Sequence, residues 1–404
     1  MKRIKIVTNE NFPFGGAPAN FLRYFSLALS DKAEIEVIMP TGNVFRKAEL
    51  KPEKKGKIGK VKYIHLGFTV HPQNFFGKIM DVIWGFTFTP IYLFFSNLCK
   101  PFNMIVLYNT HISGIFNLLL FKKIFKKKLI IILPEFYEKP TKGFIALVHW
   151  LDFYWGLKYL AKYADAFIPV SNFLKNYLET KLKIKKPILV LPNLIDPNVF
   201  EIKNTSEFIS NKITIGYTGT PTRKDGVIDL IQSFSILNKI YPNAHLLIIG
   251  DTIGGESEIP KLEKLAVDLG CREQITFTGL ISFKKIPALI NSCQILALTR
   301  PNGIFAEAGF PTKLGEYFAC KKPVLITRVG DIPLYFKNEE QAIIVEPENI
   351  DSIVKGFLKI IENKELSNKI AENGFKWMNE NLNYRNISEK LNSFVLSIAK
   401  SAIS

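Results

Sequence analysis

The chain has 404 residues, 53 of them Lys or Arg and 36 Asp or Glu, which gives a formal net charge of +17. This length allows two cores of ordinary domain size, so two domains are expected. The four cysteines lie far apart and form no C-x-x-C pair. Neither a zinc cage nor a disulfide framework is therefore indicated, and a reducing cytoplasm fits best. The basic start is not followed by the apolar run of about 7 to 15 residues that a secretory signal needs, so we expect Met1 to begin the folded domain.

Positive charge is concentrated in the first half of the chain. Up to residue 190 the sequence contains 29 Lys and Arg against 12 Asp and Glu, whereas the remainder contains 24 of each. The first half therefore holds the whole excess, which indicates an anionic partner for that half alone. Nucleic acid is not favoured, because no aromatic stacking pattern or known binding motif accompanies the charge.

Two apolar stretches are interleaved with this charge. The stretch VIWGFTFTPIYLFF (82–95) contains a proline and is shorter than the roughly 20 residues of a spanning helix, so a core or interfacial helix is expected. In FNLLLFKKIFKKK (116–128), Leu118, Phe121 and Phe125 fall on one helical face, and four lysines (122, 123, 126 and 127) fall on the other. Such a helix either lies on an anionic leaflet or packs with a solvated lysine face, and the sequence leaves both open.

Short apolar runs alternate with helical patterns along the whole chain. In the first half, strands are expected at 3–8, 33–39, 60–66, 104–108, 128–133, 165–170 and 187–192. After a polar stretch near 201–211 the pattern restarts, with strands at 213–219, 245–250, 274–279, 294–298, 323–327 and 342–346. Helical patterns follow at about 350–362, 365–380 and 384–400. Continuous apolar strands are typical of parallel sheets covered on both faces, so the sequence predicts an α/β chain of two doubly wound, Rossmann-like domains.

Open α/β sheets bind ligands beyond the carboxyl ends of their strands, so we expect an active site in a cleft between the two domains. The loop after the first strand contains Gly15 and Gly16, which allow a ligand to approach the backbone, and the next helix presents free N–H groups to an anion. A plain tight turn explains these glycines at least as well. The sequence contains no G-x-G-x-x-G, P-loop or G-x-S-x-G motif, which counts against dinucleotide enzymes, P-loop NTPases and serine hydrolases.

The restart strand ends in YTGTPTRKDGVIDLIQSF (217–234). Gly219 stands at the strand end, Arg223 and Lys224 follow in the loop, and an amphipathic helix begins behind them. Two cations and a helix N-terminus make a clamp for a diphosphate, which we favour over two merely exposed loop charges.

The segment GFPTKLGEYFACKKPV (309–324) carries polar residues at the start of an apolar helix. If the helix begins at Thr312, the N–H groups of Lys313, Leu314 and Gly315 are unpaired and available to phosphate oxygens. Glu316 lies one turn further on, where an unpaired carboxylate is unfavourable unless something binds it. It can accept hydrogen bonds from two adjacent hydroxyls, as on a ribose, while Lys313 supplies a cation for the phosphate. A nucleoside diphosphate satisfies all of these groups together.

This segment resembles the donor-binding segment of retaining glycosyltransferases of family 4 (glycosyl transferases group 1), which have the GT-B fold. VSNFLKNYL (170–178), VLPNLIDPNVF (190–200), YTGTPTRKDGV (217–227) and NYRNISEKL (383–391) resemble further motifs of that family in the same order. The resemblance covers nearly all of residues 160–395 and is loose over residues 1–160. It implies an acceptor-side domain over 1–195, a nucleotide-sugar donor domain over 196–375, and a terminal segment over 376–404 that crosses back to the first domain.

The resemblance also implies roles for single residues. Arg223 and Lys224 match the family's phosphate-binding pair, although its Arg usually stands where this chain has Thr220. Glu316 matches the second Glu of the E-x7-E motif and is expected to hold the ribose. The first Glu is replaced by Ala308, so its contacts to the donor sugar must come from Glu307, from a backbone group or from nothing.

A second departure concerns a His that many relatives carry after the fifth strand. Here IILPEFYEK places Glu135 at that point, while His111 follows the fourth strand. We expect Glu135 to hydrogen-bond the acceptor hydroxyl or the donor sugar, with a solvent-exposed loop Glu as the alternative. If the donor phosphate receives the acceptor proton, no strong protein base is required.

The resemblance thus implies a retaining, metal-independent glycosyltransferase without a bound cofactor. Its expected partners are a nucleotide-diphosphate sugar, a lipid-linked or membrane-embedded glycan acceptor and an anionic membrane surface, and not nucleic acid. Its expected place is the cytoplasm, peripheral on the inner face of the cell membrane, in cell-surface polysaccharide or glycolipid synthesis. A nucleotide-sugar epimerase of the same fold and a non-catalytic nucleotide-binding partner of an assembly complex remain as alternatives. The sequence names neither the sugar, the base nor the acceptor.

Overall fold

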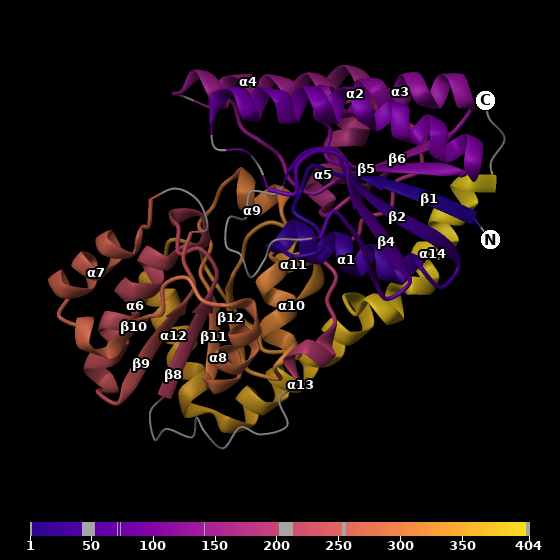
Figure 1. The fold of residues 1–404 in the computed structure, drawn as a ribbon. Helices are drawn as coiled ribbons and strands as arrows, with labels where there is room; N and C mark the ends of the chain where they lie inside the picture. Colours follow the sequence, from indigo (N-terminus) through magenta and orange to yellow (C-terminus); the bar gives the residue numbers. More distant parts are fainter. Residues whose placement is uncertain are drawn as a thin grey trace. The chain divides into compact units, whose positions relative to one another are not determined.

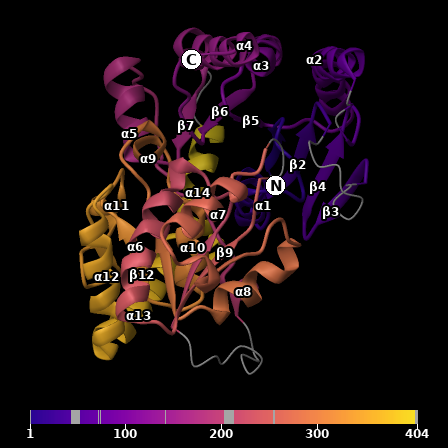
Figure 2. The same ribbon diagram turned by 90° about the vertical axis from the view of Figure 1, so that its left-hand side faces the viewer.

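The computed structural model describes residues 2–42, 53–70, 72, 74–140, 142–201, 213–252 and 256–400, so residues 202–211 of the expected polar stretch lie outside it. The chain forms two compact units (Figures 1 and 2). Unit 1 comprises Met1–Leu194 together with Tyr384–Ser404, and unit 2 comprises Ile195–Asn383. Unit 2 therefore ends at Asn383, later than the residue 375 expected for the donor domain.

Unit 1 is built on a seven-stranded sheet in the order β3-β4-β2-β1-β5-β6-β7. Neighbouring strands pair in parallel, except that β3 is antiparallel to β4. The strands are β1 (Lys2–Val7), β2 (Ala33–Met39), β3 (Lys55–Ile58), β4 (Val61–His65), β5 (Met104–Tyr108), β6 (Lys128–Leu133) and β7 (Ala166–Pro169).

Two features of this sheet differ from the sequence prediction. Residues 187–192 were predicted to be a strand, but they form only the isolated bridge between Phe167 and Ile188. Their backbone still follows β7, because Leu189 donates its N–H to the carbonyl of Phe167 at 3.0 Å and Leu191 donates to Pro169 at 2.9 Å. The second difference is β3, a short and polar edge strand (KGKI) that the pattern did not predict.

Unit 2 is built on a six-stranded sheet in the order β10-β9-β8-β11-β12-β13, and every pair in it is parallel. The strands are β8 (Ile213–Thr218), β9 (Ala244–Ile249), β10 (Ile275–Phe277), β11 (Ile295–Leu298), β12 (Val324–Thr327) and β13 (Ile343–Val345). Each lies within one or two residues of its predicted range. The two parallel-sheet units confirm the predicted α/β class with Rossmann-like domains.

The helices of unit 1 are α1 (Ala17–Leu29), α2 (Phe75–Cys99), α3 (Ile112–Phe125), α4 (Phe144–Trp155), α5 (Asn172–Asn176) and α14 (Tyr384–Lys400). The last helix is held in this unit by α1, because the side-chain amide of Asn392 donates to the carbonyl of Ala28 at 2.8 Å. The rings of Tyr24 and Tyr384 also stack, with centroids 5.5 Å apart. Helices α1 and α14 are therefore part of the same core.

The helices of unit 2 are α6 (Val227–Ile240), α7 (Ile259–Asp268), α8 (Ile286–Ser292), α9 (Ile304–Ala308), α10 (Thr312–Ala319), α11 (Ile332–Tyr335), α12 (Ile350–Glu362) and α13 (Lys364–Asn381). Most of them cover the sheet with an apolar stripe. In α12, Ile353, Phe357 and Ile360 are buried, and the helix begins where the side chain of Asn349 accepts the N–H of Ser352 at 2.9 Å. This is the ordinary amphipathic pattern of a helix between a core and water.

One helix of unit 1 departs from that pattern. The stretch 82–95 was expected to be a short core or interfacial helix, but it forms the middle of α2, which has 25 residues. By length and composition Phe76–Cys99 could cross a membrane, and only 22% of its most apolar stretch is buried. A core helix is therefore wrong for this segment.

Candidate functional site

The loop between β8 and α6 begins at Gly219, whose φ of 117° is unfavourable for any other residue. Its N–H donates to the carbonyl of Ile249 at 2.8 Å. A Cβ at this position would lie 2.4 Å from Cε of Lys313, so the lysine side chain passes directly over the glycine backbone. Gly219 is thus required for its own turn and for the passage of Lys313, and its predicted place beside the diphosphate clamp stays a prediction. Thr220 follows, and its carbonyl lies 2.8 Å from the hydroxyl of Tyr217.

A buried carboxylate organises this edge of the sheet. Asp225 is 1% exposed and forms ion pairs with Lys313 and with Arg300, whose Nε lies 3.1 Å from Oδ1. The hydroxyl of Tyr217 donates to the other carboxylate oxygen at 2.8 Å. Burial alone would raise the pKa of Asp225, but the Lys313 and Arg300 cations hold it well below its ordinary value. The three charged groups therefore carry one net positive charge. We call Asp225, Lys313 and Arg300 the cation cluster.

This arrangement changes the role expected of Lys313. The sequence analysis treated its ammonium as a free cation for the phosphate, but Asp225 neutralises it. Burial lowers the pKa of Lys313, and Asp225 opposes that shift. Arg300, which the sequence analysis missed, supplies the additional cation. Arg300 stands two residues after the predicted strand 294–298, and this position at a strand end was the available signal.

Arg223 and Lys224 lie in a single 3-10 turn (Arg223–Asp225) directly before α6. Both are exposed, and neither forms an ion pair with another residue in the described part of the chain. The ammonium of Lys224 lies 5.9 Å from the centre of the Phe305 ring. Gly226 closes the turn with a φ of 71°, and a Cβ there would lie 1.6 Å from the carbonyl oxygen of Thr299. The turn is thereby fixed against the end of β11, with its two charges toward solvent.

The helix predicted to present free N–H groups is α10, which begins at Thr312 as expected. One of the three expected donors is not free, because the N–H of Leu314 donates to the carbonyl of Pro311 at 3.1 Å. The side chain of Leu314 is fully buried in the core of unit 2. The prediction that the Leu314 N–H is unpaired is therefore wrong, and phosphate binding by Leu314 stays a prediction.

Glu316 lies one turn into α10 and is half-buried. Burial raises its pKa to about 7, and the nearby Lys313 only partly opposes this shift. Among the residues that the structure describes, none hydrogen-bonds to its carboxylate or pairs with it. A carboxylate held in this way is available to hydroxyl donors from outside the chain.

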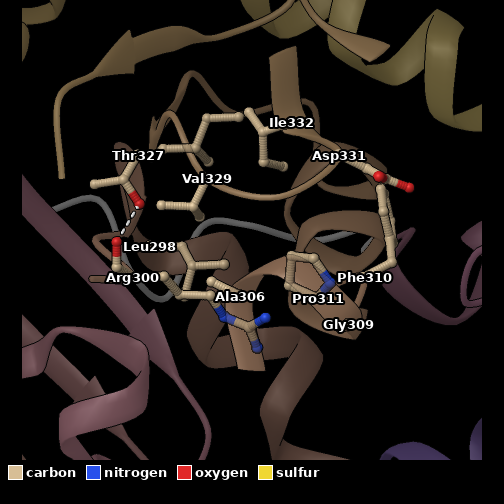
Figure 3. Close-up of a pocket in the computed structure, with 11 residues that line it drawn as sticks. Leu298, Arg300, Ala306, Gly309, Phe310, Pro311, Thr327, Val329, Asp331 and Ile332 are labelled. Carbon is tan, nitrogen blue, oxygen red and sulfur yellow. Dashed lines mark hydrogen bonds between the residues drawn. The ribbon is translucent and has the colours of Figure 1, made fainter. Parts of the chain in front are cut away.

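A hollow with about 310 Å³ of empty space, part of it open to solvent, lies at the ends of β11 and β12 (Figure 3). Arg300 stands at its wall, where the hydroxyl of Thr327 donates to the Arg300 carbonyl at 2.7 Å. Ala308, in the position of the family's first Glu, is buried at the end of α9, and its neighbour Glu307 is half-buried. The lining residues are Leu298, Arg300, Ala306, Gly309, Phe310, Pro311, Ile326, Thr327, Val329, Asp331 and Ile332.

Unit 1 carries a second polar cluster at the carboxyl ends of its strands. Glu135, after β6, accepts a hydrogen bond from the hydroxyl of Tyr137. His111 is the residue before α3, and its ring lies 6.3 Å from the Tyr137 ring. The Nδ1 atom of His111 lies 3.0 Å from a carboxylate oxygen of Asp152 in α4. Both residues singled out from the sequence therefore flank Tyr137, and Glu135 is hydrogen-bonded within the cluster.

The same cluster contains a carboxyl that the sequence analysis missed. Glu10 follows β1 by three residues, and burial raises its pKa to about 7, with a further contribution from Glu135 and an opposing one from His111. Nearby, Gly16 precedes α1 with an ordinary φ of −76°, and a Cβ on it would meet nothing within 4 Å. Neither backbone strain nor packing explains Gly16, and Gly15 before it is buried.

Residues 198–377 match the family model described as glycosyl transferases group 1. The matched range lies within unit 2 and contains the residues of the cation cluster and of α10. An uncharacterized glycosyltransferase of Methanocaldococcus jannaschii is 23% identical over 232 residues, which are 56% of this chain and 57% of the relative. A GDP-mannose-dependent α-(1-6)-phosphatidylinositol monomannoside mannosyltransferase of Mycobacterium tuberculosis is 22% identical over 175 residues, or 43% of this chain and 44% of that protein.

The chain spans about six tenths of the length of the first curated relatives that it matches, at 57%, 62% and 60%. Among solved structures, the sucrose-phosphate synthase of Thermosynechococcus elongatus aligns with a TM-score of 0.76 over 98% of this chain and 99% of that one, at 14% identity. At that identity the likeness shows the fold alone. Together with the two parallel sheets, it confirms the GT-B fold class.

Proposed function

We propose that this protein is a retaining glycosyltransferase that moves a sugar from a nucleotide-diphosphate donor to a lipid-linked or membrane-embedded glycan acceptor. The observation that carries the proposal is the Glu316 carboxylate, which has no partner among the described residues and lies on the same helix as Lys313 of the cation cluster. A ribose offers the two adjacent hydroxyls that this carboxylate can accept. A diphosphate offers the negative charge that Arg300, Arg223 and Lys224 attract.

In this proposal the chain's own cations stabilise the leaving diphosphate. Arg223 and Lys224 are exposed on a fixed turn, and Arg300, which pairs with Asp225, stands at the wall of the hollow. The bond between the sugar's anomeric carbon and the phosphate oxygen breaks while a bond to the acceptor oxygen forms on the same face. The acceptor proton passes to the leaving phosphate, so that no strong protein base is needed. The proposal requires neither a metal nor another cofactor.

The acceptor side of the proposal draws on unit 1. Its polar cluster contains Glu135, His111 and Glu10, which can bind acceptor or sugar hydroxyls. The mycobacterial relative is named for a lipid acceptor, a phosphatidylinositol mannoside. With the positive charge of the first half of the chain, this supports a place in the cytoplasm, peripheral on the membrane, and a role in polysaccharide or glycolipid synthesis.

One observation favours a second candidate, a non-catalytic nucleotide-binding protein. Ala308 has no carboxylate to touch the donor sugar, and its side chain is buried. If Glu307 or a backbone group does not replace that contact, the protein would bind the nucleotide without transferring the sugar. Binding and turnover must therefore be measured separately.

A thermal-shift panel of UDP-, GDP-, ADP- and dTDP-sugars tests nucleotide binding directly. A donor present at 100 times its dissociation constant stabilises the protein by about 2.7 kcal/mol, whereas an unrelated anion such as sulfate should not. The donor that stabilises is then incubated, radiolabelled, with a membrane lipid extract. Label in the organic phase supports sugar transfer to a lipid. Donor binding without label in that phase supports the non-catalytic candidate. If none of the four nucleotide sugars stabilises the protein, both candidate functions are contradicted.

A further inference from the structure

The outward face of α2 is apolar and its inward face is not. The residues that face the sheet recur at every fourth position, namely Asp81, Gly85, Thr89 and Leu93, and all four are buried. Only one of them is a large apolar residue. The outer positions hold twelve exposed large apolar side chains: Phe76, Ile79, Met80, Val82, Ile83, Trp84, Phe86, Phe88, Ile91, Phe94, Phe95 and Leu98. A helix between a core and water has the opposite pattern, so α2 is built to lie against something apolar.

Contacts along its whole length hold α2 on the sheet. Near its start, Asp81 accepts the N–H of Gly42 at 2.8 Å. Further along, the hydroxyl of Tyr92 lies 3.0 Å from a carboxylate oxygen of Glu36. At its end, Lys100 pairs with Glu34 at 2.9 Å. From the start of α2 to its end, the contacted residues are Gly42, just after β2, and then Glu36 and Glu34 within β2. Their numbers fall as those of the helix rise, so α2 runs antiparallel to β2.

These contacts decide between two ways in which an apolar helix meets a bilayer. A helix of 25 residues is about 37 Å long and could span the hydrocarbon core. However, a spanning α2 would carry β2 and the sheet edge into the lipid with it, where unpaired backbone groups are not tolerated. The contacts with Gly42, Glu36 and Glu34 therefore require α2 to lie in the plane of the interface.

The neighbouring helices extend the same surface. In Figure 1, α2, α3 and α4 lie side by side on one side of the unit 1 sheet, and α2 packs on α3 and α3 on α4. The side-chain amide of Asn117 in α3 donates to the Phe86 carbonyl in α2 at 2.7 Å. These two helices and the turn after them add further exposed apolar side chains: Phe116, Leu120, Ile124, Phe144, Val148, Trp155, Tyr159 and Tyr163. We call this surface, together with the twelve side chains of α2, the apolar layer.

Lysines border the apolar layer. Lys158 and Lys162 each lie 5.2 Å from the centre of an exposed tyrosine ring, Tyr159 and Tyr163 respectively. Such cation–aromatic pairs suit the boundary between headgroups and acyl chains, where Trp and Tyr gather and lysine ammoniums reach the phosphates. Further exposed lysines lie within or directly beside α2, α3 and α4, namely Lys78, Lys123, Lys126 and Lys142. The charge of the border selects an anionic bilayer over a neutral one or a second copy of this equally basic chain.

The lysine face predicted on α3 is divided in the structure. Lys122 pairs with Asp165 at 2.9 Å, and Lys127 donates to the carbonyl of Phe102 at 2.7 Å. Lys123 and Lys126 remain exposed. The expected apolar face of α3 is packed inside, with Leu118 and Phe121 buried.

We propose that the apolar layer is a docking surface that seats unit 1 in the interface of an anionic bilayer, with α2 lying in the membrane plane. This rests on the proposed function, because it places the acceptor's own environment beside unit 1. The same helices carry His111, which precedes α3, and Asp152 in α4, so the docking surface and the polar cluster share their supports. A lipid-linked acceptor would then reach the cluster without leaving the membrane.

Vesicle flotation of the full chain tests the surface. At low salt the wild-type protein should float with vesicles that contain about 30% anionic lipid, and should float much less with neutral vesicles or at high salt. The double variant Ile83→Glu, Leu98→Glu should reduce the bound fraction about tenfold or more, because it places two carboxylates in the apolar layer. The matched control is Val267→Glu, Leu334→Glu, which adds the same charge to exposed apolar positions of unit 2 and should float like the wild type.

Trp84 reports the depth of α2. It is 42% exposed and lies in the first half of the helix. Because Trp155 also belongs to the apolar layer, the Trp84 signal is taken as the difference in bromine quenching between the wild type and Trp84→Phe, which keeps an apolar ring. If α2 lies in plane, this difference should be largest with bromines near the headgroups. Strongest quenching by bromines near the bilayer centre would overturn the in-plane arrangement.

Other outcomes separate the two proposals. No flotation, or equal loss in the control variant, overturns the docking surface, and a concentration-dependent dimer that Ile83→Glu, Leu98→Glu abolishes would assign the surface to a second copy. Each variant is also run in the donor thermal-shift assay, which reports unit 2. If donor binding is absent and flotation persists, the proposed transferase function is contradicted and the docking surface is supported. If donor binding persists without flotation, the docking surface is contradicted and the nucleotide-binding part of the proposed function is supported.

Discussion

Two helices show how differently the two units treat their surroundings. In unit 2, α12 buries Ile353, Phe357 and Ile360 and turns charged residues outward. In unit 1, α2 buries Asp81 and Gly85 and turns aromatic rings outward. Both helices lie against parallel strands of a sheet, so the strand direction does not explain the difference. We propose that the medium on the outer side of each helix explains it, with water against α12 and the bilayer interface against α2.

The lysine and arginine side chains of the two units also differ in how they are held. In unit 2, Lys313 and Arg300 surround a buried Asp225, which fixes them at the end of the sheet. In unit 1, Lys123 and Lys126 are exposed on the border of the apolar layer. Fixed cations select a particular anion by geometry, whereas a loose border of lysines selects a charged surface.

The largest effect is expected where unit 2 holds its cations. Asp225→Ala leaves Lys313 and Arg300 close together without their carboxylate, and breaking such a buried pair costs roughly 3 to 5 kcal/mol of unfolding free energy. Urea unfolding of the purified variant measures this loss. Asp268→Ala, an exposed aspartate on α7, is the control and should stay within about 0.5 kcal/mol of the wild type. Equal stabilities would show that Asp225 does not hold the cluster.

A second pair of substitutions compares the two faces of α3. Phe121 is 4% exposed and stacks near Phe102, so Phe121→Ala should lower the unfolding free energy by roughly 3 to 5 kcal/mol. Phe116 on the outer face is 54% exposed, and Phe116→Ala should change stability by less than about 0.5 kcal/mol while it weakens vesicle binding. Comparable losses of stability would mean that the outer face is packed in solution.

Glu316→Gln should separate stability from binding. Its pKa is raised to about 7, so the folded state binds a proton that the unfolded state releases near the ordinary value of 4.5. Stability contributed by the protonated group is therefore lost as pH rises from about 4.5 through about 7. At pH 8 the free energy of unfolding of Glu316→Gln, measured with urea, should equal or exceed that of the wild type. Between pH 4.5 and 7 its free energy of unfolding should decline less than that of the wild type. Nucleotide affinity should fall by roughly 1.5 to 3 kcal/mol, the value of a hydrogen bond to a charged group.

The smallest effect is expected for the exposed pair in the β8–α6 turn. Arg223→Gln and Lys224→Gln should each weaken nucleoside diphosphate binding by up to about 1 kcal/mol, because exposed charges are screened by water and salt. Calorimetric titrations at low and high salt should show the difference shrinking as salt rises. A nucleoside without phosphates is the control ligand and should bind both variants like the wild type. An unchanged diphosphate affinity at low salt would remove the two residues from the site.

Much of the fold could be predicted because its strands are continuous apolar runs. The ranges of β5, β6, α12 and α14 coincide with those expected from the sequence. The four residues of β3 were missed because an edge strand of KGKI has no apolar pattern, and 187–192 was overpredicted because the segment follows β7 without forming a ladder. The length of α2 was underestimated, since its apolar pattern was judged only between residues 82 and 95.

The candidate site was predictable only where its residues are close in sequence. The Glu316 segment and the Arg223 turn each stand out locally. The pairing of Asp225 with Lys313 joins residues 88 positions apart, and that of His111 with Asp152 joins residues 41 apart. No local pattern shows such pairs, so Lys313 was assigned a free charge and Glu10 was overlooked.

The central claim, that Glu316 holds the hydroxyls of a donor ribose, is tested most directly by comparing two ligands on two proteins. The nucleoside diphosphate chosen from the donor panel and its 2′,3′-dideoxy analogue are titrated calorimetrically into the wild type and into Glu316→Gln. The wild type should bind the analogue about tenfold to a hundredfold more weakly than the parent nucleotide, as expected for the loss of a charged hydrogen bond. In Glu316→Gln the two ligands should bind nearly alike. The same preference for the parent nucleotide in both proteins would contradict the account.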